Sequence, residues 1–315
     1  MTKIIAEFCQ NHNGDMSILK DMVWSAAENG ATHGKIQTIF VEDLANREGF
    51  DEGVVDDNGK QVRIKRPYQA EYDRLKKLEL SYKQHEEFMA ECEKAKLIPL
   101  TTCFSNRRIK EIRDLGFKSI KVASYDCGSF PLIEGLAETY DEIIVSTGAT
   151  YNEEIEKTAG ILKNSGKDYS LLHCVTIYPT PLNEIHLNRL NYLKTFTPNV
   201  GLSEHTDSDK DGVKASIGAL YFGANILERH FTVLERTESR DGPVSINGAQ
   251  LKELYDFSKM SKDDQLEYVK EKLPEYEVML GNSERALSDT ELLNRDYYRG
   301  RFASIENGKT TFNWE

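Results

Sequence analysis

The sequence has few cysteines, no long apolar run and no excess of positive charge, and each absence excludes a class of protein. Its five cysteines are odd in number and form no Cys-x-x-Cys pair, which favours reduced thiols in a cytoplasmic protein over a disulfide framework. No apolar run approaches the roughly 18 to 20 residues that a membrane span requires, and the start shows no signal-peptide pattern. The formal net charge of −12 argues against nucleic acid or an anionic membrane as the main partner. A small anionic substrate stays compatible with this charge if a few cations gather in one cleft.

The chain repeats one pattern eight times: a short apolar run, a polar cluster, and a segment whose apolar residues have helical spacing. Several of the runs are apolar at almost every position, which is typical of strands covered on both faces. Asp15, Ser81 and Asn247 precede helical periods and are expected to be N-caps. The expected strands are residues 3–8, 34–38, 97–101, 119–123, 142–145, 169–173, 199–203 and 225–228.

Eight strand–helix units predict an α/β fold of the closed (β/α)8, or TIM barrel, type. An open doubly wound sheet is the alternative, but the Gly-rich dinucleotide fingerprint is missing after the first strand. Residues 41–80 are long and charged, as expected for a lid or a surface excursion. Residues 294–315 lack the helical spacing of apolar residues and are expected to form an extended tail with a turn at Gly308. We expect a catalytic barrel over residues 1–285 and a short C-terminal extension over residues 286–315.

Chemically active side chains gather at the carboxyl ends of the expected strands, where such a barrel places its active site. His205 and His230 follow the last two strands, and neighbouring strands would bring their imidazoles together as half of a divalent-metal site. Lys35 and Lys121 lie within strands and are candidates to face the barrel interior. These residue types suit an anionic substrate beside a metal that polarises a carbonyl.

Hydroxyl, amide and acid side chains complete this face. Cations and fixed hydroxyl donors are what a phosphorylated carboxylate requires, and amides and acids can bind sugar hydroxyls. The hydroxyls are Thr102, Ser124, Ser146, Thr176 and Ser203, and the amides and acid are Asn13, Gln37 and Asp126. Of the other histidines, we expect His173 to be structural, and His33, His85 and His186 to be solvated because they fall outside the strand ends.

Taken together, these motifs resemble the N-acetylneuraminate (sialic acid) synthase family. The resemblance runs in order through residues 3–290, and its motifs are specific only in combination. The segments that carry it are residues 6–15, 35–38, 75–81, 101–105, 120–124, 146–148, 172–181, 201–206 and 226–232.

The resemblance implies a metal-dependent transferase that condenses phosphoenolpyruvate with an N-acylated amino sugar aldehyde, releasing phosphate and forming a nonulosonic, sialic-acid-like acid. It implies a divalent cation, Mn²⁺ or Mg²⁺, on His205 and His230, and it implies a homodimer. The phosphoenolpyruvate contacts would be Lys35, Thr102, Lys121, Ser124, Ser146, Thr176 and Ser203. The sugar contacts would be Asn13, Gln37, Asp126 and Tyr178, with Asp126 also steering a water molecule.

The sequence departs from the family pattern at three places. Glu204 stands where aspartate is usual before the histidine, and Asp241 is the replacement for an acidic sugar contact that is otherwise missing. Many members end in an antifreeze-like domain that delivers an arginine to the partner's active site. The sequence ends at Glu315 without such a domain, and Arg299 or Arg301 would substitute for that arginine.

Two other functions remain open at this point. A Schiff-base aldolase acting on a related sugar acid would use Lys121 or Lys35 as its nucleophile. A non-catalytic barrel that binds a sugar phosphate would not need the pair of histidines. The identity of the acceptor sugar, and whether it carries a phosphate, does not follow from the sequence.

Overall fold

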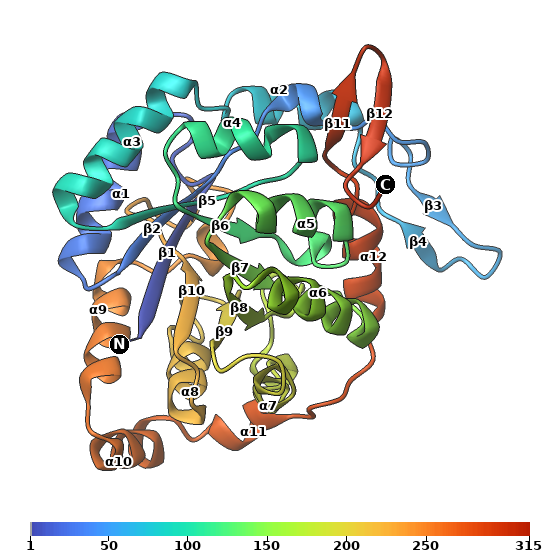
Figure 1. Cartoon of the computed structure of the whole chain (residues 1–315). Helices are drawn as coiled ribbons and strands as arrows, with labels where there is room; N and C mark the ends of the chain where they lie inside the picture. Colours follow the sequence, from blue (N-terminus) through green and yellow to red (C-terminus); the bar gives the residue numbers. More distant parts are fainter. Residues whose placement is uncertain (1) are drawn as a thin grey trace.

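Eight parallel strands close into a barrel in the computed structural model, which describes residues 2–315 (Figure 1). Their order around the barrel is β1-β10-β9-β8-β7-β6-β5-β2. The (β/α)8 prediction is confirmed, and every expected strand agrees with the observed one to within two residues at either end. The barrel strands are β1 (Lys3–Cys9), β2 (His33–Gln37), β5 (Ile98–Thr102), β6 (Ser119–Val122), β7 (Glu142–Ser146), β8 (Asp168–His173), β9 (Val200–Glu204) and β10 (Ile226–His230).

Helices surround the barrel, and the expected caps begin several of them (Figure 1). The side chains of Asp15, Ser81 and Asn247 each accept a backbone hydrogen bond from the first turn of the helix that follows. Among residues 2–315, no helix is long and apolar enough to cross a membrane. The helices are α1 (Met16–Glu28), α3 (Tyr82–Ala95), α4 (Ile109–Asp114), α5 (Phe130–Thr139), α6 (Asn152–Ser165), α7 (Arg189–Lys194), α8 (Lys214–Phe222), α9 (Gly248–Lys259), α10 (Lys262–Lys272) and α11 (Tyr276–Leu280), with 3₁₀ turns η2 (Asn106–Arg108), η3 (Ser124–Asp126), η4 (Leu182–Glu184) and η5 (Gly242–Val244).

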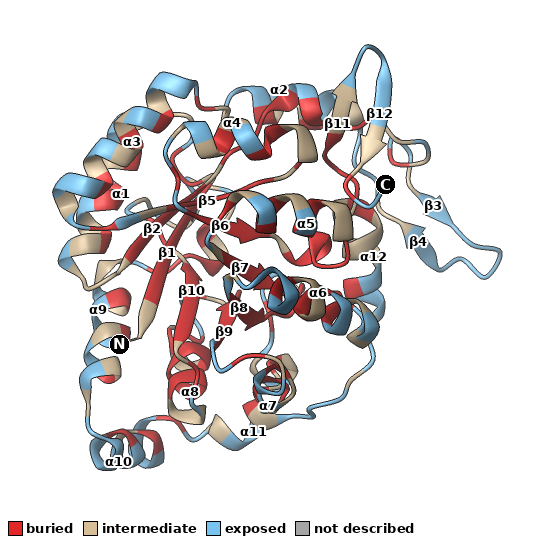
Figure 2. Cartoon of the chain, in the orientation of Figure 1, coloured by how far each residue is buried: buried red, intermediate tan, exposed pale blue. Residues whose placement is uncertain are grey.

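The strands are buried on both faces (Figure 2). The larger hydrophobic core lies between strands and helices, and a small cluster fills the barrel interior. That inner cluster is Ile5, Leu100, Ile144, Leu172 and Ile226. Because side chains alternate along a strand, the residue two positions further on faces the same interior, nearer the carboxyl end. Those residues are Glu7, Thr102, Ser146, Cys174 and Glu228. The barrel interior therefore changes from apolar to polar toward the strand ends.

The segment of residues 41–80 leaves the barrel after β2. It contains the 3₁₀ turn η1 (Val41–Asp43), a small hairpin of β3 (Val54–Val55) and β4 (Gln61–Arg63), and helix α2 (Tyr68–Lys76). The hairpin projects away from the barrel (Figure 1), and Val55 is 63% exposed. The expected surface excursion is confirmed for this hairpin.

The C-terminal segment forms a helix and a hairpin. Helix α12 (Asp289–Tyr298) begins at a capping box of Ser288 and Glu291, and β11 (Ala303–Glu306) pairs with β12 (Lys309–Phe312). The expectation of an extended tail over residues 294–315 is therefore wrong, although the expected turn at Gly308 is present, with φ of +77°. The helix is fixed to the barrel because Asn294 Nδ2 donates to Thr176 O at 2.7 Å and an Arg295 Nη1 donates to Ala149 O at 2.6 Å.

A buried ion pair ties β9 to β10. The Glu204 carboxylate accepts from Arg229 Nη1 at 2.6 Å, from Ser216 Oγ at 2.7 Å, and from both the backbone N–H and the hydroxyl of Thr206. Both side chains of the pair are only 1% exposed. Glu204 thus links β9 to β10 through a buried ion pair and its accompanying hydrogen bonds.

Removal of this carboxylate should destabilise the fold strongly. The Glu204→Gln variant leaves Arg229 charged and buried without its counterion, so its free energy of unfolding should fall by about 3 to 5 kcal/mol. Urea unfolding measures the loss. The matched control is Glu52→Gln. Glu52 and its partner Lys65 are both exposed, so this variant should leave the midpoint of urea unfolding unchanged. Equal midpoints for the two variants would refute the structural role of Glu204.

Candidate active site

Two buried lysines form the centre of a polar cluster inside the carboxyl end of the barrel. The Lys35 ammonium forms an ion pair with the Glu7 carboxylate. Lys121 Nζ donates to Ser146 Oγ at 2.6 Å and lies 3.5 Å from Glu228 Oε1. The side chains of both lysines are at most 3% exposed. The structure therefore brings together two cations and two carboxylates that come from four different strands.

The charges of this cluster act on one another. Burial lowers the pKa of Lys35 to about 7, against the opposing effect of the Glu228 carboxylate. Burial opposes ionisation of Glu228, but the ammonium groups of Lys121 and Lys35 outweigh it and lower the pKa of that carboxyl. Ser203 Oγ also donates to Glu228 Oε1 at 2.8 Å. The second oxygen of Glu228 is buried and has no hydrogen-bond partner within residues 2–315.

The predicted hydroxyls lie around this cluster. Thr102 is buried on β5 and pairs in register with Lys121 on β6, and Ser124 and Thr176 are buried just beyond β6 and β8. Thr176 Oγ1 has no hydrogen-bond partner in the described part of the chain. Buried polar atoms without partners are rare in proteins because their desolvation is costly. Such atoms at the strand ends indicate a place where a polar ligand is received.

The two predicted histidines are neighbours. Their ring centroids are 5.1 Å apart. The Tyr178 ring packs edge-on against His205, with a distance of 4.4 Å between the ring centroids. Burial lowers the pKa of both imidazoles, so both rings are neutral at physiological pH. His230 Nδ1 is buried without a hydrogen-bond partner among residues 2–315.

Cys9 and Asp241 lie against His230. The Cys9 sulfur, a ring nitrogen of His230 and a carboxylate oxygen of Asp241 all lie within 4.8 Å of one another. Cys9 lies within the segment of residues 6–15 that carries the family resemblance, but the sequence assigns it no role in the site.

Asp126 is held by a residue from the far end of the chain. Its Oδ1 accepts from Ser129 Oγ at 3.0 Å and from Asn313 Nδ2 at 3.0 Å. Asn313 also donates to Phe104 O at 2.9 Å, so it bridges the loops after β5 and β6. Burial raises the pKa of Asp126 to about 6, while these hydrogen bonds and the Arg299 cation act in the opposite direction.

The two candidate arginines of the C-terminal segment have different partners. Arg301 forms an ion pair with Glu71 of α2, whereas Arg299 lies 3.3 Å from Glu154 of α6. Of the two, Arg299 is the one whose charge acts on Asp126. Tyr298, its neighbour, stacks on Tyr125 with a centroid distance of 4.8 Å.

The predicted sugar-binding amides lie at the edge of the site. Gln37 Oε1 accepts from Gln10 Nε2 at 3.3 Å. Asn13 has a left-handed backbone with φ of +52°, and its Nδ2 donates to Glu238 O at 2.9 Å. Tyr178 is 47% exposed. Asn13 and Tyr178 are therefore exposed at the mouth of the barrel, whereas the two lysines are buried in its interior.

The prediction that His33 and His85 are solvated is wrong. His33 Nδ1 lies 2.7 Å from Thr32 Oγ1, and His85 Nε2 lies 3.0 Å from Thr38 Oγ1. Both rings are buried because these hydroxyls satisfy a ring nitrogen. His173 Nε2 lies 2.7 Å from Ile185 O, which agrees with its expected structural role.

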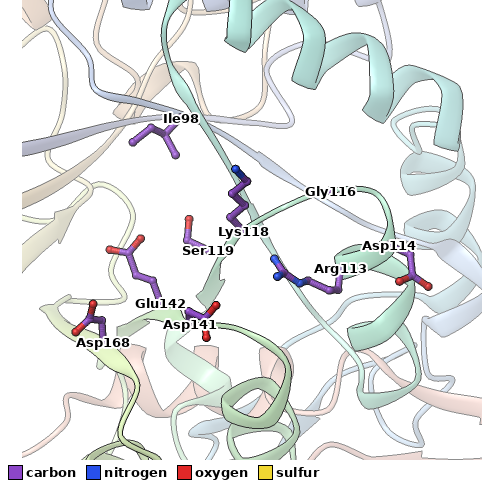
Figure 3. A pocket seen from close by; sticks show the side chains of 9 residues that line it. All are labelled: Ile98, Arg113, Asp114, Gly116, Lys118, Ser119, Asp141, Glu142 and Asp168. Atoms are coloured by element: carbon purple, nitrogen blue, oxygen red, sulfur yellow. The ribbon is translucent and has the colours of Figure 1, made fainter.

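A hollow at the opposite end of the barrel has a different character (Figure 3). It is lined by the first residues of three strands, Ser119, Glu142 and Asp168, together with Arg113 and Lys118. Side chains of both charges surround it. Active sites of such barrels lie at the carboxyl ends of the strands, so we place the site at the lysine and histidine clusters.

Comparison with known proteins identifies a family. The NeuB family model matches residues 22–265. The N,N'-diacetyllegionaminic acid synthase of Campylobacter jejuni is 32% identical over 257 residues, which cover 80% of this chain and 74% of that protein. The N-acetylneuraminate-9-phosphate synthase of Drosophila melanogaster is 31% identical over 256 residues, covering 80% of this chain and 65% of that one.

A solved structure shares the fold. The N-acetylneuraminic acid (sialic acid) synthetase of Leptospira borgpetersenii, crystallised with citrate, superimposes with a TM-score of 0.70. The alignment covers 87% of this chain and 93% of that chain at 24% sequence identity. The similarity supports the barrel architecture.

Proposed function

Because the chain belongs to the NeuB family, we propose that it condenses phosphoenolpyruvate with the aldehyde of an N-acylated amino sugar. The products are phosphate and a nonulosonic acid. The observation that carries the proposal is the pair of buried lysines, Lys35 and Lys121, within the polar end of the barrel. Two ammonium groups at this depth suit a small, multiply charged anion.

Phosphoenolpyruvate would be bound by the lysines and the hydroxyls around them. Its carboxylate and phosphate would share Lys35 and Lys121 with the carboxylates of Glu7 and Glu228, which already hold these ammonium groups in place. The unpartnered Thr176 hydroxyl supports this assignment because it offers a free donor. The remaining proposed donors are Thr102, Ser124, Ser146 and Ser203.

A divalent cation, Mn²⁺ or Mg²⁺, fits the two histidines. The unpartnered Nδ1 of His230 is the observation that tests this fit, since it is a buried ring nitrogen without a hydrogen-bond partner among residues 2–315. His205 and His230 would hold the cation. When bound, the cation supplies Lewis-acid polarisation of the sugar aldehyde.

The acceptor sugar would be met by Asn13, Gln37, Tyr178 and Asp126, which lie at the mouth of the barrel. Bond formation joins the enol carbon of phosphoenolpyruvate to the aldehyde carbon, whose oxygen takes up a proton. Positive charge then develops on the carbon that bears phosphate. Water adds to that carbon, and the Asp126 carboxylate orients it and takes its proton. Loss of phosphate, with cleavage of the carbon–oxygen bond, leaves the ketone.

We further propose a cytoplasmic homodimer. All five cysteines are buried and unpaired, which suits a reducing compartment. The valines of the β3–β4 hairpin are exposed, namely Val54, Val55 and Val62, and could be covered by a second copy. Light scattering at micromolar concentration tests the dimer against a monomer of 35.9 kDa.

A phosphate-release screen tests the function. Purified protein, with and without manganese, is given phosphoenolpyruvate and either N-acetylmannosamine, a diacetamido-trideoxyhexose or a phosphorylated N-acyl hexosamine. We expect release of phosphate that requires both the metal and one of these sugars. Metal-loaded protein that releases no phosphate with any N-acyl amino sugar would overturn the proposal.

Activity should fall on the acid side as Asp126 takes up a proton. Its pKa of about 6 predicts half-maximal kcat/KM near that pH, with the active carboxylate above it. The groups that face Asp126 are Asn313, Ser129, the Arg299 cation and the Cys103 thiol. Asn313→Ala removes a donor to the carboxylate, so the acid limb should move to higher pH.

The control for this variant is Thr310→Ala, an exposed position on β12 just before Asn313, which should keep the original profile. A profile of kcat/KM that does not move in Asn313→Ala, in protein with an unchanged circular dichroism spectrum, would show that Asp126 is not the titrating group.

A further inference from the structure

Three potential metal ligands meet beside the histidine pair, and they come from three separate segments. Cys9 ends β1, His230 ends β10, and Asp241 lies in the loop immediately before η5. The Cys9 sulfur, a His230 ring nitrogen and an Asp241 carboxylate oxygen are mutually within 4.8 Å. A sulfur, a nitrogen and an oxygen at this separation can all reach one cation after small side-chain rotations, because their bonds to a metal are about 2.0 to 2.3 Å long.

The backbone at Cys9 is irregular in a way that serves this cluster. Cys9 has φ of +48°, a left-handed conformation that residues with a side chain rarely adopt. The register between β1 and β2 also shifts between Glu7 and Cys9. Bulges of this kind re-aim side chains at the rims of barrels, and strained backbone persists where the surroundings impose it, commonly at functional sites. Glu7 Oε1 accepts from the Cys9 backbone N–H at 2.7 Å and so fixes the bend.

Cys9 and Asp241 are in contact with each other, but neither satisfies the ring nitrogen Nδ1 of His230. His230 Nδ1 is buried and has no hydrogen-bond partner among residues 2–315. The nearest carboxylate oxygen, Asp241 Oδ2, lies 3.9 Å away, which is too far for a hydrogen bond. A cation between the two atoms would satisfy both. The centroid of the His205 ring lies 5.1 Å from that of His230.

We propose that Cys9 and Asp241 are metal ligands together with His230 and His205, so that the centre contains a thiolate. Binding of the cation by these four residues does not depend on the proposed function. Only the role of the cation in the reaction rests on it. Asp241 then binds the cation rather than the sugar. Thiolate and imidazole ligands favour Zn²⁺, Co²⁺ or Fe²⁺, whereas Mg²⁺ and Mn²⁺ prefer oxygen ligands. We expect the affinity of this site to fall in the order Zn²⁺, Co²⁺, Mn²⁺, Mg²⁺.

Cobalt provides a direct readout of the sulfur ligand. The full-length protein is stripped with a chelator and titrated with Co²⁺ while the near-ultraviolet spectrum is recorded. We expect an intense thiolate-to-cobalt charge-transfer band that saturates at one Co²⁺ per chain and disappears when Zn²⁺ is added. Cys9→Ser should still bind Co²⁺ but without this band, and Asp241→Asn should keep the band with affinity lowered at least tenfold.

The discriminating control is Cys174→Ser. The Cys174 sulfur lies 3.9 Å from His205 Nδ1, so it is a second thiol beside the histidine pair. The band should survive in Cys174→Ser. Loss of the band in that variant, with retention in Cys9→Ser, would overturn the assignment of Cys9. Bound Co²⁺ with no thiolate band in the unaltered protein would overturn the inference and leave a two-histidine site and the proposed reaction intact. A normal band in protein that makes no product would overturn the reaction alone.

Discussion

Lys121→Met should lower kcat/KM for phosphoenolpyruvate by about 10² to 10³, as the loss of one preorganised electrostatic contact does in other enzymes. The ammonium group is fully desolvated between Ser146 and Glu228, so no water replaces it when the substrate arrives. Its removal also leaves the buried Glu228 carboxylate with one cation fewer, which repels an anionic substrate. Steady-state kinetics at saturating sugar measure the effect.

The matched control is Lys118→Met, which removes a lysine from the hollow at the opposite end of the barrel and should leave kcat/KM unchanged. A Lys121→Met variant that keeps more than a tenth of the original value would remove this residue from the site. Lys121 is also the nucleophile of the Schiff-base alternative. Borohydride trapping of a substrate adduct in chelated protein would support that alternative and contradict a role as a fixed cation.

His205→Ala and His230→Ala should each abolish turnover, with a loss of at least about 10³ in kcat, because metal activation contributes several kcal/mol to such reactions. Each variant should also bind less metal, as measured by the stoichiometry of bound Co²⁺ after dialysis. The two rings lie 5.1 Å apart at the ends of adjacent strands, so neither substitutes for the other.

The control here is His186→Ala. His186 follows η4, and its Nδ1 accepts a hydrogen bond from the Asn282 backbone N–H rather than from a residue of the site. The activity and metal content of the His186→Ala variant should match those of the unaltered protein. Turnover retained in both His205→Ala and His230→Ala would remove these residues from the metal site, whatever the outcome for Cys9.

The barrel could be predicted because several of its strands are covered on both faces and are therefore apolar at almost every position. Once the strands were placed, parallel packing fixed which residues share the carboxyl-terminal rim, so Lys35, Lys121, His205 and His230 followed from the fold. The family followed from the order of short motifs, each of them weak when taken alone.

The contacts that complete the site could not be predicted, because they join residues distant in sequence. Asn313 and Asp126 are 187 positions apart, and neither has a neighbour that indicates the other. The side chain of Cys9 is directed by a bulge and a left-handed φ, which no local pattern specifies. The burial of His33 and His85 depends on hydrogen bonds to Thr32, Thr38 and the Ser81 carbonyl, which no local pattern specifies.

An isotope experiment distinguishes carbon–carbon bond formation with loss of phosphate from simple hydrolysis of phosphoenolpyruvate. Phosphoenolpyruvate carrying ¹⁸O in its bridging carbon–oxygen–phosphorus position is incubated with the metal-loaded protein and the acceptor identified in the screen. Mass spectrometry then follows both products. We expect one labelled phosphate for each new nonulosonic acid, because the carbon–oxygen bond breaks. Unlabelled phosphate together with pyruvate would show hydrolysis at phosphorus and would refute the proposed condensation.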